Sequence, residues 1–207
     1  MALIVITACS DTTTTTPTEP TESEVTIGSQ TWMTRNLDVA FFRNGDSIPE
    51  ARTNAAWVQA ASEQRAAWCY YNNDPANGKQ YGKLYNWYAV HDPRGLAPTG
   101  MRVATLNDWQ VLVQELGGGQ QAGLHLKASV GWANVANGNN SSGFWAVPGG
   151  ARDNDNFGLL GTFASIWTST DDDSLHAWHV ILSSSGKDVL TYSQEKSRGR
   201  SVRCIKQ

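Results

Sequence analysis

The sequence lacks both an excess of positive charge and a long apolar run. Its 16 Lys and Arg residues are outnumbered by 19 Asp and Glu residues, which gives a formal net charge of −3. This balance argues against nucleic acid as a general partner, because proteins that bind nucleic acid carry basic patches. No apolar run reaches the roughly 18 residues that a membrane-spanning helix needs. The sequence therefore predicts no nucleic-acid binding and no membrane-spanning helix.

The common catalytic and metal-binding motifs are also missing. The sequence contains no G-x-S-x-G, H-E-x-x-H, P-loop or Rossmann glycine pattern. Residues 153–156 and 171–173 are rich in Asp and Asn, but the glycine and terminal glutamate of a calcium loop are absent, so we interpret both as solvated turns. His176 and His179 fall in a predicted strand, which disfavours a shared metal ion. We expect no catalytic residue, no metal and no cofactor.

The start of the chain resembles a bacterial lipoprotein signal. Residues 1–9 read MALIVITAC, an apolar run that ends in small residues before Cys9. No Lys or Arg precedes the run, and the run is short for a signal peptide; a short disordered apolar start is the alternative. Residues 10–24 form a Thr/Pro/Glu tract that cannot build a core and is typical of a disordered tether. We expect Cys9 to carry a lipid that anchors the chain to a membrane, with no other membrane contact.

The remaining residues, 25–207, are expected to form one domain rich in aromatic side chains. Nine Trp, six Tyr and five Phe supply much buried area, and 19 Gly suit a fold with many loops. Residues 25–33 predict two short strands around a Gly-Ser turn. The clearest helix spans 106–116, with Thr105 as N-cap and Asp108 three residues on, and residues 122–128 predict a second helix.

Other parts of this domain give weaker patterns. Residues 144–150 and 157–167 predict strand, turn and strand. Residues 50–67 have helical composition but poor apolar spacing, so we expect a loop with at most one helical turn.

Residues 163–204, the display segment, interleave two kinds of residue. A framework is predicted from Trp167, Trp178, Leu182, Cys204 and similar positions. Between them lie residues without a chemical theme, which we take as candidate ligand-binding positions: Ile166, Asp171, Asp173, Leu175, His176, His179, Ile181, Ser183, Leu190, Tyr192, Arg198 and Arg200.

Because side chains alternate between the two faces of a strand, this segment predicts which of its residues are buried and which are exposed. In the predicted strand, Trp178, Val180 and Leu182 point inward, whereas Ala177, His179 and Ile181 point outward. We expect Trp167, Trp178, Leu182 and Cys204 to be buried. We expect His176, His179, Tyr192 and Arg198 to be exposed, and a mixture of the two sets in the structure would refute a simple division into framework and display.

Ordered motifs across residues 25–206 resemble the Fibrobacter succinogenes major paralogous domain family. They include IGSQTWMTRNL at 27–37, LYNWYAV at 84–90, LAPTG at 96–100, PGGAR at 148–152, WTST at 167–170 and SVRC at 201–204. The resemblance implies an α+β, C-type-lectin-like fold of the formylglycine-generating-enzyme type, with short antiparallel strands, two helices and extensive loops. It also implies an exported protein, often lipid-anchored.

The same fold occurs in the variable proteins of diversity-generating retroelements, in which template adenines are mutated and asparagine codons are rewritten. Fourteen asparagines occur in residues 1–156 and none in 157–207. That distribution is what such rewriting leaves, although chance and a plain paralogous surface domain remain alternatives.

In an exported domain, the pair Cys69 and Cys204 suggests a disulfide, with two buried thiols as the alternative. We expect a ligand-binding protein of the bacterial cell envelope that contacts a protein or glycan. The alternatives are a structural envelope lipoprotein and a modifying enzyme of the formylglycine-generating type.

Overall fold

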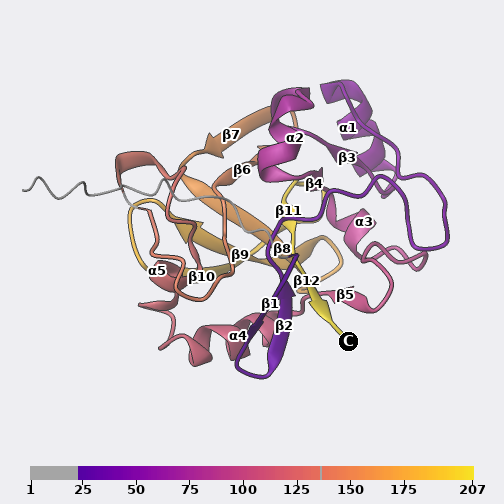
Figure 1. Cartoon of the computed structure of the whole chain (residues 1–207). Coiled ribbons are helices and arrows are strands. Elements are labelled where there is room, and N and C mark those ends of the chain that lie inside the picture. Colours follow the sequence, from indigo (N-terminus) through magenta and orange to yellow (C-terminus); the bar gives the residue numbers. More distant parts are fainter. Residues whose placement is uncertain (1–22, 136) are drawn as a thin grey trace, which may run out of the picture.

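A computed structural model describes residues 23–135 and 137–207 of the chain (Figure 1). The predicted signal at 1–9, the lipidation site Cys9 and nearly all of the tether at 10–24 lie outside these residues. The first strand begins at Glu24, so the last residue assigned to the tether belongs to the folded domain. Within the described ranges, no helix is long and apolar enough to cross a membrane.

A four-stranded sheet joins the beginning of the domain to its end. Its strand order is β1-β2-β12-β5, with bounds β1 Glu24–Ile27, β2 Gln30–Met33, β12 Cys204–Lys206 and β5 Met101–Val103. The predicted hairpin at 25–33 is confirmed, and Gly28 turns it with a φ of 57°, a conformation that glycine adopts without strain. Ile205 of β12 lies opposite Trp32 of β2. The two ends of the domain are therefore direct neighbours.

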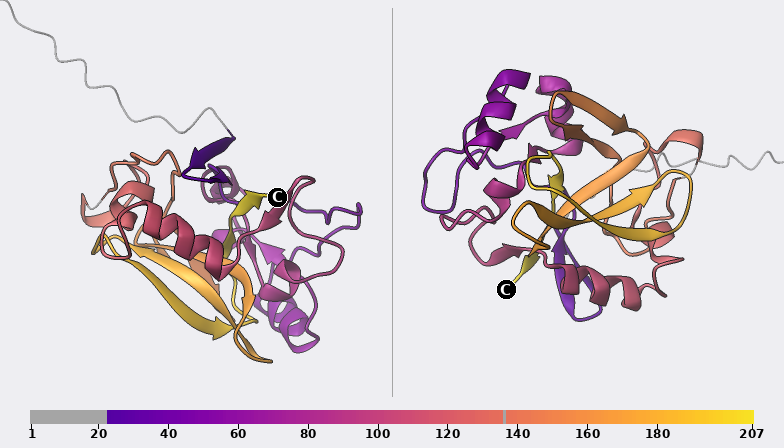
Figure 2. Two further views of the ribbon diagram at one scale, coloured as in Figure 1. Left: turned by 90° about the horizontal axis from the view of Figure 1, so that it is seen from below. Right: turned by 180° about the vertical axis from the view of Figure 1, so that it is seen from behind.

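A larger, strongly twisted sheet carries the display segment (Figure 2). Its strand order is β10-β9-β8-β6-β7, and β11 pairs in parallel with β8. The bounds are β6 Gly149–Asp153, β7 Asn156–Leu160, β8 Phe163–Asp171, β9 His176–Ser183, β10 Val189–Glu195 and β11 Ser201–Val202. Strand β10 forms one edge of this sheet.

The helices are short and lie beside the sheets. They are α1 Asn54–Ser62, α2 Ala76–Tyr81, α3 Trp87–Val90, α4 Leu106–Glu115 and α5 Ala122–Leu126, with 3-10 turns at Tyr71–Asn73 and Ala133–Val135. A two-stranded sheet, β3 Trp68–Cys69 with β4 Leu84–Tyr85, lies between α1 and α3 in the sequence. The domain is thus mixed α+β, as predicted; it is mostly sheet, and its described residues hold five α-helices rather than two.

Helices α4 and α1 show what sequence patterns capture and miss. In α4 the predicted capping box is present, because Thr105 and Asp108 bond reciprocally, and Arg102 holds the Asp108 carboxylate with two nitrogens. The loop prediction for 50–67 was wrong. Thr53 caps a nine-residue helix that buries Trp57 completely against the body of the domain. Burial of this one large side chain stabilises the helix, although the helix lacks regular apolar spacing.

Aromatic side chains join the elements into one core. Trp32 of β2, Trp109 of α4 and Phe144 lie with ring centroids 5.1–5.5 Å apart. Together with Leu112, these rings belong to a buried cluster that also receives side chains of β8 and β9. This cluster supports the large sheet from one side.

Two fully buried arginines fix the irregular segments. Arg152 donates to oxygens of Ala51, Thr53, Asn54, Asn73 and Asn154, and its guanidinium lies over the ring of Trp57. Arg203 donates to the carbonyls of Met33, Phe144 and Trp145 and to Oδ1 of Asn36. Each guanidinium satisfies carbonyls that loops cannot pair within a sheet, which accounts for the PGGAR and SVRC motifs in physical terms.

Candidate functional site

Strands β8, β9 and β10 present two faces of different character. Residues that lie opposite one another on antiparallel strands share a face. On the inner face, Val180 and Leu182 of β9 join the aromatic core cluster. The register places the other set on the outer face: Phe163, Ser165 and Trp167 of β8, His179, Ile181 and Ser183 of β9, and Leu190 and Tyr192 of β10. The predicted alternation along β9 therefore agrees with the register.

Exposure does not follow this alternation at His179, which is only 2% exposed. Its ring lies in a row between Trp167 and Tyr192, at centroid distances of 5.7 Å and 6.4 Å. Its Nδ1 is hydrogen-bonded to Oγ of Ser165 at 3.0 Å. The prediction that His179 is an exposed contact residue was wrong, because neighbouring strands supply rings large enough to cover it.

Four other positions depart from the prediction. Ala177, predicted to point outward, is fully buried in a core cluster. Ile166 is fully buried on the inner face. Arg200 is 4% exposed because it donates to the Arg152 and Gly199 carbonyls and to Oδ1 of Asp153. Trp178, predicted to be buried, is only half-buried. The predicted buried and exposed sets are thus mixed, so a simple division of the segment into framework and display is wrong.

A smaller set of the predicted positions stays accessible. Leu190 is 44% exposed and Tyr192 is 50% exposed on the outer face, beside the half-buried Ile181 and Ser183. Leu175, 60% exposed, lies at the hairpin between β8 and β9. Arg198 is half-buried, with its guanidinium bonded to Glu195 and 3.5 Å from Asp153.

The hairpin tip between β8 and β9 is a polar turn that uses its own carboxylate. Asp173 accepts hydrogen bonds from the backbone N–H of Leu175 (2.7 Å), from the side chain of His176 and from its backbone N–H. These bonds lower the pKa of Asp173 to about 2. Asp171 is exposed, with Oδ2 3.9 Å from Nζ of Lys196. Residues 23–135 and 137–207 contain no group of three or more His, Cys, Asp or Glu side chains placed to hold a metal ion.

The predicted disulfide between Cys69 and Cys204 is absent. Both are free buried cysteines, and they belong to different core clusters, Cys69 beside Trp57 and Cys204 beside Trp167. Burial raises the pKa of Cys69 to about 11 and that of Cys204 to about 12. Both thiols are therefore protonated near neutral pH, and burial keeps them from acting as nucleophiles.

Sequence patterns gave no sign of a groove between α4 and the edge of the large sheet. This cavity of about 260 Å³ is lined by Trp109, Gln110, Val113 and Gln114 of α4 and by Gly119, Val180, Val189 and Thr191. The indole Nε1 of Trp109 is buried and finds no acceptor among the described residues. A buried donor without a partner at a cavity wall is a position where a ligand oxygen gains a hydrogen bond.

The backbone of β10 beside this groove is also free to pair. The N–H of Val189 donates to the carbonyl of Gly119, so it points away from β9. Because these directions alternate along an antiparallel strand, the N–H and C=O groups of Thr191 and Ser193 point the same way. Within the described chain no backbone group bonds to them. The edge of β10 thus offers unpaired donors and acceptors next to the exposed Leu190 and Tyr192.

Burial of His179 gives a pH dependence that can be measured. Burial, together with the charge of Arg200, lowers the pKa of His179 to about 3 in the folded protein. Between its ordinary value of 6.5 and about 3, the unfolded chain binds a proton that the folded chain does not. As the pH falls through this window, the free energy of unfolding should therefore decrease by about 1.4 kcal/mol per pH unit.

The variant His179→Gln tests this expectation, since an amide can bond Ser165 but does not titrate. Urea unfolding between about pH 6 and pH 4.5 should show a shallower pH slope for His179→Gln than for the wild type. Carboxylates such as Asp173 lose their contribution mainly below this window. Equal slopes for the two proteins would contradict a neutral, buried His179.

The fold and the site together define a mixed α+β domain whose larger, aromatic-rich sheet has an open edge at β10. The model of the Fibrobacter succinogenes major domain matches residues 25–206. The chain belongs to that family, as its motifs predicted. No curated protein and no solved structure matches the chain.

Proposed function

We propose that the chain is a surface-displayed ligand-binding protein that holds a partner protein against the outer face and open edge of strand β10. The observation that carries this proposal is the clustering of exposed Leu190 and Tyr192 beside unpaired strand backbone. Large exposed apolar side chains of this kind mark interaction sites, and tyrosine is common among the residues that dominate binding energy.

The rigidity of the strands beneath also supports binding. Tyr192 lies over the buried row of His179 and Trp167, and the inner face of the same strands is fixed by the aromatic core. A contact surface held in this way loses little conformational entropy when a partner binds. A glycan is the alternative ligand, but the apolar character of Ile181, Leu190 and Tyr192 favours a protein.

The proposal includes the finer fold assignment and the location. We place the domain in the C-type-lectin-like class of the formylglycine-generating-enzyme type, anchored in the bacterial cell envelope through a lipid on Cys9. A structural envelope lipoprotein is the second candidate. The modifying-enzyme alternative loses support, because Cys69 and Cys204 are buried, separate and protonated.

Diversification by a retroelement, if it occurs, is restricted by burial. Substitution of Ile166, His179 or Arg200 would disturb the core, so tolerated variation should concentrate at accessible positions such as Leu175, Leu190 and Tyr192. An adenine-rich near-copy of the codons for residues 167–204 beside a reverse-transcriptase gene would support this hypothesis. Absence of such a copy from the neighbouring DNA would refute the hypothesis of diversification.

The double variant Leu190→Ser/Tyr192→Ser tests the proposed function. The full chain is screened against arrays of extracellular proteins and of glycans, and each ligand is titrated against wild type and variant. We expect protein ligands, with affinity reduced about 100-fold in the variant because two central apolar contacts are lost. The unfolding midpoint should fall only modestly, since both side chains are about half exposed and Tyr192 covers only one edge of the His179 ring.

The matched control is Phe41→Ser/Val111→Ser, which removes two apolar side chains that are at least 43% exposed and lie elsewhere. It should bind like the wild type. Ligands that bind the Leu190/Tyr192 variant as tightly as the wild type would refute the proposal, and a response confined to the glycan array would favour the alternative ligand.

A further inference from the structure

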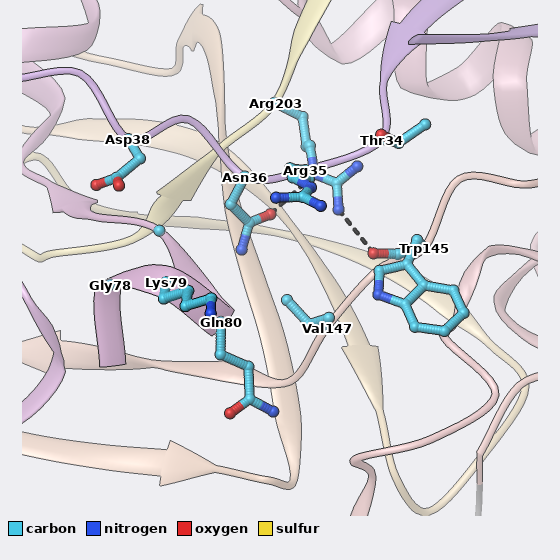
Figure 3. Close-up of a pocket in the computed structure, with 11 residues that line it drawn as sticks. Thr34, Arg35, Asn36, Asp38, Gly78, Lys79, Gln80, Trp145, Val147 and Arg203 are labelled. Atoms are coloured by element: carbon cyan, nitrogen blue, oxygen red, sulfur yellow. Dashed lines mark hydrogen bonds between the residues drawn. The ribbon is translucent and has the colours of Figure 1, made fainter. Parts of the chain in front are cut away.

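Two places in the fold combine polar groups with open space, and they differ in what they offer a ligand. The cavity of about 110 Å³ in Figure 3 is lined by residues that include Asn36 and Arg203. The amide of Asn36 and the guanidinium of Arg203 already donate to protein oxygens. The edge of β10 instead carries backbone groups that no described residue bonds, so a partner gains most there.

Only a short stretch of the edge of β10 is free. At one end, the N–H of Val189 donates to the carbonyl of Gly119. At the other end, the N–H and the carbonyl of Glu195 are both bonded within the chain. Between these limits, the N–H and C=O groups of Thr191 and Ser193 that point away from β9 have no partner among the described residues.

An antiparallel strand fits this stretch. In an antiparallel pair, one residue exchanges both of its backbone hydrogen bonds with a single residue opposite, and such pairing is slightly more stable than parallel pairing. Two partner residues therefore satisfy the free groups of Thr191 and Ser193, and a third residue between them lies opposite Tyr192. Residues 189–194 contain no proline and no charged side chain, which are common protections of an exposed edge.

The surroundings of Thr191 determine the side chain that suits one end of the added segment. Partner residues opposite Thr191 and Ser193 point to the inner face of the sheet, toward α4, whereas the residue opposite Tyr192 points to the outer face. Beside Thr191 lies the groove of about 260 Å³, and the residues that line it, Val113 and Val189 among them, are all uncharged. A charged side chain would lose hydration there without a counterion, so an apolar side chain fits.

The surroundings of Ser193 are acidic. Asp172, in the turn between β8 and β9, is exposed and accepts a hydrogen bond of 2.7 Å from Oγ of Ser193. The neighbouring Asp171 and Asp173 each face a basic side chain, but Asp172 forms no ion pair within the described residues. A Lys or Arg on the added segment, beside Ser193, would supply that pair.

We propose that the edge of β10 binds an extended segment of a partner protein by antiparallel strand addition, in the order basic, aromatic or apolar, apolar. The basic residue lies beside Ser193 and Asp172, the middle residue lies opposite Tyr192, and the last residue enters the groove beside Thr191. This inference rests on the proposed function, since it takes the occupant to be the partner protein held there, and it adds the form and the sequence of the segment that the partner presents.

Hydrogen exchange of backbone amides, measured by NMR on the isotope-labelled full chain, tests the strand addition. The probe is the peptide acetyl-Thr-Arg-Tyr-Val-Thr-amide, which carries the expected order. The amides of Thr191 and Ser193 should exchange rapidly in the free chain, because they bond no described group. When the peptide is present at about ten times its dissociation constant, their exchange should slow about tenfold, because it then proceeds from the small unbound fraction.

A second peptide, acetyl-Thr-Glu-Tyr-Val-Thr-amide, tests the basic position. It should bind about fivefold more weakly than the arginine peptide, and this difference should disappear in Asp172→Asn. The matched control is Asp155→Asn, which changes another exposed carboxylate that accepts a hydrogen bond in a turn, and which should keep the difference. Equal affinities of the two peptides for the wild type would overturn the proposed order.

The other outcomes separate strand addition from the proposed function. Absence of peptide binding, or unchanged exchange at Thr191 and Ser193 when the peptide binds, would overturn strand addition. Protection of the two amides that rises with protein concentration in the absence of peptide would do the same, because the edge would then pair with a second copy of the chain. A protein ligand that binds through Leu190 and Tyr192 but leaves both amides unprotected would leave the proposed function standing and refute the pairing.

Discussion

Arg203→Ala is expected to lower the free energy of unfolding by about 3–5 kcal/mol. The change removes a fully buried guanidinium and leaves the carbonyls of Met33, Phe144 and Trp145 and Oδ1 of Asn36 without donors. Each buried acceptor that loses its partner costs about 1–3 kcal/mol, partly offset because the desolvated charge of Arg203 disappears with it. Equilibrium unfolding in urea measures the difference.

Two further variants separate hydrogen bonding from volume. Arg203→Met keeps most of the apolar bulk but no donor, so it should remain strongly destabilised. Arg94→Ala removes an exposed arginine that pairs with Asp46 and Asp92, and should cost much less than Arg203→Ala. If Arg203→Met were as stable as the wild type, packing rather than carbonyl pairing would explain the contribution of Arg203 to stability.

Trp32→Ala should destabilise the domain by a similar amount, about 3–5 kcal/mol. Trp32 has no exposed surface, lies opposite Ile205, and contacts the rings of Trp109 and Phe144 at 5.1 Å and 5.5 Å. Its removal opens a void where the N-terminal hairpin, α4 and the last strand meet. Thermal and urea unfolding should both show the loss.

Trp32→Phe serves as the graded comparison, because it retains an aromatic ring and leaves a smaller void. It should cost clearly less than Trp32→Ala. Val111→Ala on the exposed side of α4 should change stability by less than about 0.5 kcal/mol. A Trp32→Ala protein as stable as the Val111→Ala protein would show that the core relaxes around the missing ring.

Local signals in the sequence predicted the elements that local interactions form. The hairpin at 25–33 needs only a glycine turn between short strands, and α4 needs only its capping box and apolar spacing. The alternation of β9 also follows from sequence, since side chains on a strand must point to opposite faces. Family membership came from ordered motifs over nearly the whole domain.

Long-range packing decided what the sequence could not show. Helix α1 forms because Trp57 is buried beneath Arg152, from a distant strand. His179 is covered by rings from two neighbouring strands, although its own strand pattern directs it outward. Cys69 and Cys204 lie in separate core clusters, and their positions in the sequence do not reveal this separation.

Closure of the four-stranded sheet has a consequence for how the chain folds. The hairpin of β1 and β2 completes its pairing only with β12, so the first strands of the domain cannot complete their sheet before residues 204–206 have been synthesised. Contacts of such sequence separation slow folding, because a long loop must close before they form. A nascent chain on the ribosome therefore stays incompletely folded until β12 emerges, and truncation before Cys204 should leave the N-terminal hairpin without this partner strand.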